Sequence, residues 1–181
     1  EEHFEMTKKP KHGYGKNMNP CIDCHAMMLN YAGRYMEEHG YDFLITGEVL
    51  NQRPMSQNLK SLDIVKKESG YEHKILRPLS ALRLPPTEME LSGMVDRSKL
   101  LGISGKSRKA QMELAEKMGI ADYPSPAGGC SLTEPNYANR LKDLYKYNKE
   151  KADSHDIKLL NIGRHFRLTD KIKAISTRTE E

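Results

Sequence analysis

The chain has 181 residues, enough for one sizeable hydrophobic core and at most a small second domain. Apolar residues make up 37% and charged residues 30%, a balance that excludes a fibrous protein, and no apolar run approaches the length needed to cross a bilayer. The net charge of +4 suits a polyanionic partner but does not require one, since a mildly basic surface also serves solubility.

The first half of the chain alternates expected helices and strands. Residues 1–20 are rich in Gly and Lys and show no sustained periodicity, so we expect a loop there. The apolar spacing then predicts a helix over 25–38, a buried strand over 42–47, a helix from 59 to the closing Gly70, and a strand over 74–79. This order predicts an α/β fold.

The second half is expected to be mainly helical and to end in strands. Thr87 is an expected N-cap for a short helix. Further helices are predicted over 95–101, 107–118 and 136–147, and β-like runs over 157–162, 165–168 and 172–175. The last runs predict the start of a small β-rich module.

The two ends of the sequence shape what is expected of the whole protein. The chain begins with Glu1, without the basic and apolar segments of a secretory signal, so we expect a cytoplasmic protein. It stops in a polar run just after an expected strand. We therefore expect a fragment that lacks part of its active site.

The three cysteines are the strongest chemical signal. Cys21 and Cys24 lie three apart at the start of an expected helix, where backbone N–H groups and the helix dipole stabilise thiolates. Cys130 follows a loop, residues 123–129, that contains two prolines and two glycines. Three cysteines cannot all pair with one another, and in a reducing compartment a C-x-x-C pair favours metal binding or redox work over a structural disulfide.

Several interpretations of these thiols stay open. With His25 they would form a Cys3His zinc site, whereas three thiolates alone would hold an iron–sulfur cluster with one iron open to another ligand. The cysteines would otherwise be three unrelated buried residues, or the C-x-x-C pair would belong to a thiol–disulfide oxidoreductase. The oxidoreductase leaves Cys130 and the Arg53 loop unexplained.

Several motifs in one order resemble a known family across nearly the whole chain. They are similar to the tRNA 2-thiouridylases and related thiouridine synthases of the PP-loop ATP pyrophosphatases. The segments that carry the resemblance are Asn19-Pro20-Cys21-Ile22-Asp23-Cys24-His25, residues 47–57, Leu76-Arg77-Pro78-Leu79-Ser80, residues 123–130 and Gly163-Arg164-His165-Phe166-Arg167-Leu168.

The resemblance implies a fold and a division of the chain. It implies the C-terminal part of a Rossmann-like parallel-sheet domain of the adenine nucleotide alpha hydrolase (HUP) type. Residues 1–80 would belong to that domain, residues 81–150 would be mostly helical and carry the third cysteine, and residues 155–181 would begin a truncated β-rich module.

The resemblance also implies an enzyme, a tRNA sulfurtransferase. It would use ATP with Mg²⁺ to adenylate a uracil oxygen, after which sulfur from a donor protein or sulfide replaces that oxygen. Cys130 would carry the sulfur as a persulfide and Cys24 would resolve the intermediate. In related enzymes three thiolates hold a [4Fe-4S] cluster instead, and Cys21 favours that version.

The chain departs from the family pattern in one respect. The phosphate-binding S-G-G-x-D-S element is not in the sequence, so we expect it upstream of Glu1 and expect this fragment alone to be inactive. Glu48 and Gln52 follow a strand and are candidates for the nucleotide or uridine pocket. Arg53, Lys106, Arg108 and Lys109 are candidate tRNA contacts, although a solvated helix end explains the last three equally well.

A second hypothesis comes from a different class of protein. A zinc-stabilised RNA-binding module without catalysis would use the same three cysteines as structural ligands. Chelation would then unfold the domain.

Overall fold

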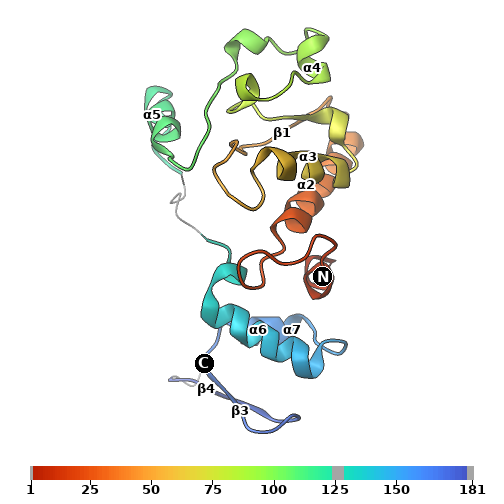
Figure 1. The fold of residues 1–181 in the computed structure, drawn as a ribbon, viewed down its shortest axis with the longest axis vertical. Helices are drawn as coiled ribbons and strands as arrows, with labels where there is room; N and C mark the ends of the chain where they lie inside the picture. The colour runs from red at the N-terminus through yellow and green to blue at the C-terminus, as the bar shows by residue number, and fades with distance from the viewer. Residues whose placement is uncertain (1, 124–128, 179–181) are drawn as a thin grey trace. The chain divides into compact units, whose positions relative to one another are not determined.

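The computed structural model describes residues 2–123 and 129–178, and the chain divides into two compact units (Figure 1). Unit 1 comprises Glu1–Pro20 and Gly128–Glu181, and unit 2 comprises Cys21–Ala127. Unit 2 is therefore inserted into the sequence of unit 1. The expected boundaries after residues 80 and 150 stay a prediction.

Unit 2 is built on a helix–strand–helix–strand segment. Helix α2 (Cys21–Glu38) leads to strand β1 (Leu44–Ile45), and helix α3 (Leu59–Glu68) leads to strand β2 (Ile75–Leu76). The two strands pair in parallel, with Leu44 opposite Ile75 and Ile45 opposite Leu76. The expected α/β class is confirmed in this mixed form, while the Rossmann-like assignment stays a prediction.

The core of unit 2 lies between α2, α3 and the strands. Met36, Val49, Leu62, Val65 and Ile75 are at most 3% exposed. Helices α2 and α3 pack side by side, and α3 is capped by Asn58, whose side chain accepts a hydrogen bond from Ser61 N. Ile45 is 68% exposed, so the expectation of a fully buried first strand is wrong at that position.

The rest of unit 2 consists of short elements. Helix α4 (Glu88–Leu91) begins at the predicted cap, Thr87, which forms a capping box with Glu90, and α5 (Lys109–Lys117) confirms the predicted helix over 107–118. The predicted helix over 95–101 is wrong. The structure has only a 3₁₀ turn, η3 (Arg97–Lys99), because the Asp96 side chain holds Ser98 N. The described residues contain three further 3₁₀ turns, η1 (Glu72–Lys74), η2 (Ala81–Arg83) and, in unit 1, η4 (Ser131–Thr133).

Unit 1 joins the two ends of the sequence. Helix α6 (Pro135–Asn148) confirms the predicted helix over 136–147, and helix α7 (Ser154–Leu159) follows it. An antiparallel hairpin of β3 (Arg164–Arg167) and β4 (Lys173–Ser176) confirms the last two predicted strands (Figure 1). Its core contains Met18, Leu132, Leu141, Leu144 and Leu160.

Two predictions for unit 1 are wrong. Residues 2–8 form helix α1 (Glu2–Lys8) rather than a loop, because Phe4 packs on the unit 1 core and Thr7 is buried against Tyr145. The predicted strand over 157–162 begins inside α7, because Asp153 and Asp156 form a capping box that starts a helix.

No helix in the described ranges is long and apolar enough to cross a membrane.

Candidate catalytic site

Cys21 and Cys24 lie in the first turn of α2, as the sequence predicts. The helix begins at Cys21, four residues before the predicted start, so both cysteines are inside it. Both are partly buried, and neither forms a disulfide. The backbone N–H groups of a first helical turn and the positive end of the helix dipole favour thiolates at this position.

The residue that follows the pair is tied to a buried carboxylate. His25 Nδ1 lies 2.9 Å from Glu48 Oε1, and Glu48 is 8% exposed. Because an ionised carboxylate only accepts hydrogen bonds, Nδ1 carries the proton and donates a hydrogen bond to Glu48. His25 therefore presents Nε2 as its second ring nitrogen. Cys21, four residues earlier, lies on the same helix face as His25.

Arg77 completes this network from the other strand. Its Nε donates to Glu48 Oε2 at 2.8 Å, and its Nη2 donates to the Leu62 carbonyl oxygen at 3.3 Å. Arg77 is 7% exposed, so the pair is buried. The carboxylate is satisfied on both oxygens, and Thr46 Oγ1 also donates to Oε2 at 3.2 Å.

These contacts keep Glu48 ionised. Burial alone would raise the pKa of Glu48, but the hydrogen bond from His25 and the charge and hydrogen bond of Arg77 together hold this pKa below its ordinary value of 4.5. A negative charge therefore lies between His25 and Arg77 at neutral pH.

The strand order explains why these residues meet. Glu48 follows β1 and Arg77 directly follows β2, and the two strands are parallel neighbours. Their carboxyl ends lie at the same edge of the sheet, where open α/β sheets place ligand contacts. The helix that carries the cysteines contacts this sheet at β1.

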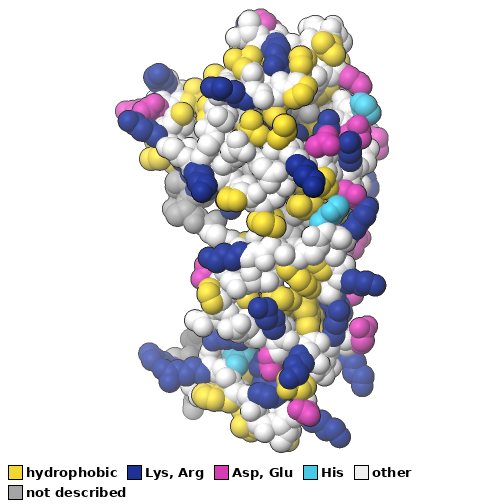
Figure 2. All heavy atoms as spheres, viewed as in Figure 1, with side chains coloured by type: hydrophobic (Ala, Val, Ile, Leu, Met, Phe, Trp, Pro, Cys, Tyr) yellow, Lys and Arg dark blue, Asp and Glu magenta, His cyan; other side chains and the backbone are white. Residues whose placement is uncertain are grey.

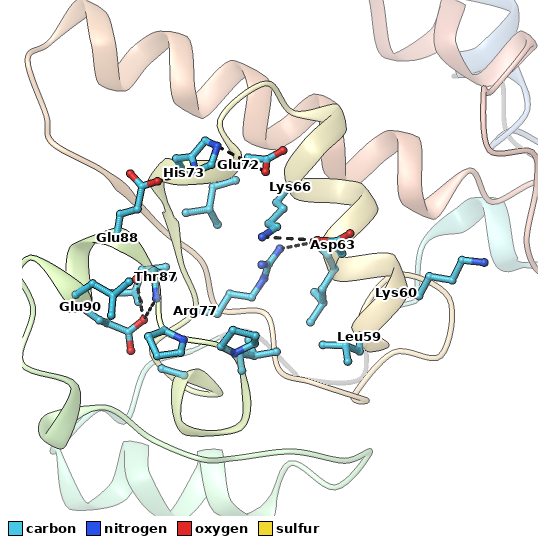
Figure 3. Close-up of a pocket in the computed structure, with 18 residues that line it drawn as sticks. Leu59, Lys60, Asp63, Lys66, Glu72, His73, Arg77, Thr87, Glu88 and Glu90 are labelled. Atoms are coloured by element: carbon cyan, nitrogen blue, oxygen red, sulfur yellow. Dashed lines mark hydrogen bonds and ion pairs between the residues drawn. The ribbon is translucent and has the colours of Figure 1, made fainter.

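Arg77 also lines a pocket of about 630 Å³ beside α3 and β2 (Figure 3). The volume is within the range of small-molecule sites. In Figure 3, Lys66 and Arg77 extend toward Asp63 from different elements, while Thr87 lies against Glu90 across the pocket. Basic and acidic side chains are balanced around it, namely Lys60, Lys66, His73 and Arg77 against Asp63, Glu72, Glu88 and Glu90.

The other predicted pocket residues lie outside this lining. Glu48 contacts Arg77 but does not line the pocket, and Gln52 Nε2 instead donates to Gln111 Oε1 on α5. Their roles in a nucleotide or uridine pocket stay predictions.

The four predicted RNA contacts come from two segments that the structure brings together. Leu50 and Ser104 form a parallel bridge, and Gly105 N donates to the Leu50 carbonyl oxygen at 2.8 Å. This holds the loop of Gln52 and Arg53 against the basic segment. Lys106 and Lys109 are exposed, Arg108 is half-buried, and Lys109 pairs with Glu113 at 3.8 Å.

Cys130 belongs to unit 1, whereas Cys21 and Cys24 belong to unit 2. Cys130 is exposed and precedes η4, where its carbonyl oxygen accepts from Thr133 N at 2.8 Å. Residues 124–128 of the loop expected to deliver it lie outside the described residues. The meeting of the three thiols stays a prediction, and within the described part of each unit no three His, Cys, Asp or Glu side chains are grouped to hold a metal ion.

Comparison with known proteins finds a family match for one part of the chain. Residues 4–83 match the family model described as thiamine biosynthesis protein (ThiI). For this segment, the resemblance to the PP-loop thiolation family is confirmed. The ThiI match covers less than half of the chain and includes Cys21, Cys24, His25, Glu48 and Arg77. Comparison with curated proteins gives no significant match, and comparison with solved structures gives none either.

Arg77 is the site residue that sequence reasoning missed. The available signal was the position of Arg77 directly after an apolar strand. Glu48 occupies a similar position near the end of the preceding strand. The partnership of His25 with Glu48 spans 23 residues and had no local signature.

Proposed function

We propose that the protein transfers sulfur to a uridine of tRNA in an ATP-dependent reaction. One observation carries the proposal. A dithiol in the first turn of a helix is followed by a histidine that a buried carboxylate and arginine hold in place, within the segment that matches the ThiI model.

The residues of this chain would act on the thiols in a defined way. The start of α2 stabilises thiolates at Cys21 and Cys24. Glu48 fixes the proton of His25 on Nδ1, so Nε2 is the ring nitrogen that can accept a proton from a thiol of the same helix face. Arg77 keeps Glu48 ionised and therefore keeps His25 in that tautomer.

In the persulfide version of the reaction, Cys130 carries the transferred sulfur. The terminal sulfur of its persulfide attacks the adenylated uracil carbon, and AMP leaves with the former uracil oxygen. The Cys24 thiolate then attacks the Cys130 sulfur and releases thiouridine, which leaves a Cys24–Cys130 disulfide that a thiol reductant must open. ATP with Mg²⁺ and a sulfur donor are required partners of this proposal.

The three thiols are also suitable ligands for an iron–sulfur cluster or a zinc ion. Thiolates at Cys21, Cys24 and Cys130 would hold a [4Fe-4S] cluster, which would supply an iron site for a substrate sulfide. The Nδ1 hydrogen bond of His25 to a carboxylate is also the arrangement that supports a metal-ligating histidine, so zinc on three thiolates and Nε2 is the competing assignment.

Anaerobic reconstitution with iron and sulfide separates these assignments. We expect a brown protein with cluster absorbance and stoichiometric iron, and we expect Cys21→Ala, Cys24→Ala and Cys130→Ala each to abolish both. The matched control is Ser131→Ala, next to Cys130. A colourless protein that retains one zinc and unfolds when the zinc is chelated would instead support the RNA-binding module without catalysis.

Thiolation itself is tested in cells that lack the gene. We expect tRNA hydrolysates from these cells to lose a thiouridine, measured by mass spectrometry, and the wild-type gene to restore it. Cys24→Ser and Cys130→Ser should not restore it. Unchanged thiouridine after deletion of the gene would contradict the proposed function.

A further inference from the structure

The two units differ in charge. Unit 1 contains 15 Lys and Arg against 11 Asp and Glu, whereas unit 2 contains 14 of each. The whole net charge of +4 therefore belongs to unit 1. Figure 2 shows Lys and Arg side chains spread over the drawn face of unit 1. A polyanion would be attracted mainly to this unit.

A loop in unit 1, residues 9–17, concentrates this charge. The sequence has no Asp or Glu between Glu5 and Asp23, and Lys9, Lys11 and Lys16 are exposed in the loop. We call residues 9–17 the lysine loop. It also contains Gly13 with φ +70°, a left-handed conformation that glycine adopts without strain.

The lysine loop is held in a fixed shape. Tyr14 Oη donates to the Thr7 carbonyl oxygen at 2.6 Å, and Gly15 N donates to the Asn19 carbonyl oxygen at 2.8 Å. These bonds anchor the loop to α1 and to the segment before α2. Its lysines are therefore presented from an ordered backbone rather than from a flexible tail.

The same loop is attached to the turn that carries Cys130. Asn17 Nδ2 donates to the Thr133 carbonyl oxygen at 2.7 Å, and Thr133 Oγ1 donates to the Cys130 carbonyl oxygen at 2.6 Å. Met18 N also donates to the Leu132 carbonyl oxygen at 3.1 Å. All of these residues belong to unit 1, so loop and cysteine are placed by the same body.

We propose that the lysine loop binds the phosphate backbone of tRNA and holds the substrate beside Cys130. This inference rests on the proposed function for the identity of the polyanion. Lysine ammonium groups bind phosphates as point charges, and they position a nucleic acid without reading its sequence. Glu134, after the turn, is exposed and lies outside the loop.

The lysine loop and the segment with Lys106, Arg108 and Lys109 are competing locations for RNA contact. The unit that contains this segment carries no net charge. We therefore assign the stronger electrostatic contact to the lysine loop.

The test measures binding of an unmodified tRNA transcript to the full chain over a range of salt concentrations. We expect K9Q/K11Q/K16Q to weaken binding at least about tenfold and to reduce the slope of log affinity against log salt by about 2 to 3, because each lost phosphate contact removes about 0.7 to 0.9. The matched control, K74Q/K99Q/K117Q, neutralises three exposed lysines of unit 2 and should change neither quantity. Far-UV circular dichroism confirms that each triple variant is folded.

Each outcome decides one question. Equal affinity of the loop variant and the control would overturn the assignment, as would a loss confined to K106Q/R108Q/K109Q. A loop-dependent tRNA affinity in a protein that makes no thiouridine in cells would uphold the loop and reject the proposed function. If the loop variant still forms thiouridine undiminished and binds tRNA as tightly as wild type, the proposed function is upheld and the loop assignment is rejected.

Discussion

Glu48 is the residue on which the candidate site depends. It is buried between His25 and Arg77, and each of its carboxylate oxygens has a charged or polar partner within 2.9 Å. A buried pair of this kind contributes little compared with apolar packing, but breaking it leaves an uncompensated charge in the interior. The arrangement therefore orients His25, but the loss of one partner would strongly destabilise the fold.

Replacing Glu48 with Gln tests whether the carboxylate compensates the buried charge of Arg77. We expect Glu48→Gln to lower the free energy of unfolding by about 3 to 5 kcal/mol at neutral pH, because the Arg77 guanidinium is left buried without a counter-charge. Denaturant unfolding followed by circular dichroism measures the change. Asp63→Asn, which breaks only the half-exposed pairs with Lys66 and Lys67, should cost less than about 1 kcal/mol.

The pH dependence of stability gives an independent reading of Glu48. Because its folded pKa is below the ordinary 4.5, its contribution is complete above about 4.5 and is lost as the pH falls through the lower folded pKa. The difference in unfolding free energy between wild type and Glu48→Gln should therefore shrink as the pH is lowered below 4.5. A difference that stays constant from pH 7 to pH 3 would show that Glu48 is not held ionised by its neighbours.

At the scale of elements, a glycine sets how closely α2 approaches the segment after α3. A Cβ at Gly33 would lie 2.2 Å from Cδ2 of the Tyr71 ring and 2.6 Å from its Cγ. The base of the ring is involved, and Tyr71 Oη is also bonded to Glu37 on α2 at 2.8 Å. The ring cannot swing away without losing this bond.

We expect Gly33→Ala to destabilise unit 2 by about 1 to 3 kcal/mol through overpacking, despite the higher helix propensity of Ala. A double-mutant cycle with Tyr71→Ser checks the cause, since Gly33→Ala should be neutral or stabilising once the ring is gone. Equal destabilisation in both backgrounds would show that the cost does not come from the ring.

The elements also show what the sequence could and could not predict. Helices α2, α3, α5 and α6 carry apolar residues at helical spacing and were predictable from that pattern. The start of α7 was missed because the apolar residues from Ile157 onward look like a strand, while the signal lies upstream in Asp153 and Asp156. Helix α1 was missed because its packing partner Tyr145 is 138 residues away from Thr7.

The candidate site was predictable to a similar degree. The thiol pair at a helix start follows from local spacing, and its position in the first turn of α2 confirms that. The contacts of Glu48 with His25 and with Arg77 depend on which strands are neighbours, and no local pattern contains that information. Charge composition likewise suggested a polyanion partner but did not show that the net charge belongs to unit 1.

At the scale of the whole molecule, residues 2–18 complete the core of unit 1. Met18 is 6% exposed and packs with Leu132, Leu141 and Leu144, and Phe4 packs against the same cluster. Helix α1 therefore depends on residues from the far end of the sequence.

Removing residues 2–18 should loosen α6 and leave α3 unchanged. Loss of Met18 and Phe4 opens a cavity against α6 and should lower its stability by at least about 2 kcal/mol. Hydrogen exchange of the α6 amides should then accelerate by about 30-fold or more, while exchange in α3 stays constant. The point variant Met18→Ala should act in the same direction, and the exposed Met28→Ala should not. Unchanged exchange in α6 would contradict this dependence.

The insertion of unit 2 into unit 1 has a consequence for how the chain acquires its structure during synthesis. Unit 2 closes through contacts among residues 21–127, whereas the bonds of Asn17 with Thr133 and of Thr7 with Tyr145 join residues 116 and 138 positions apart. Since domains made earlier on the ribosome fold as units while translation continues, unit 2 can fold before the partners of α1 emerge. Throughout that interval Phe4 and Met18 have no core to enter, so residues 2–18 are the part of unit 1 most in need of protection from aggregation.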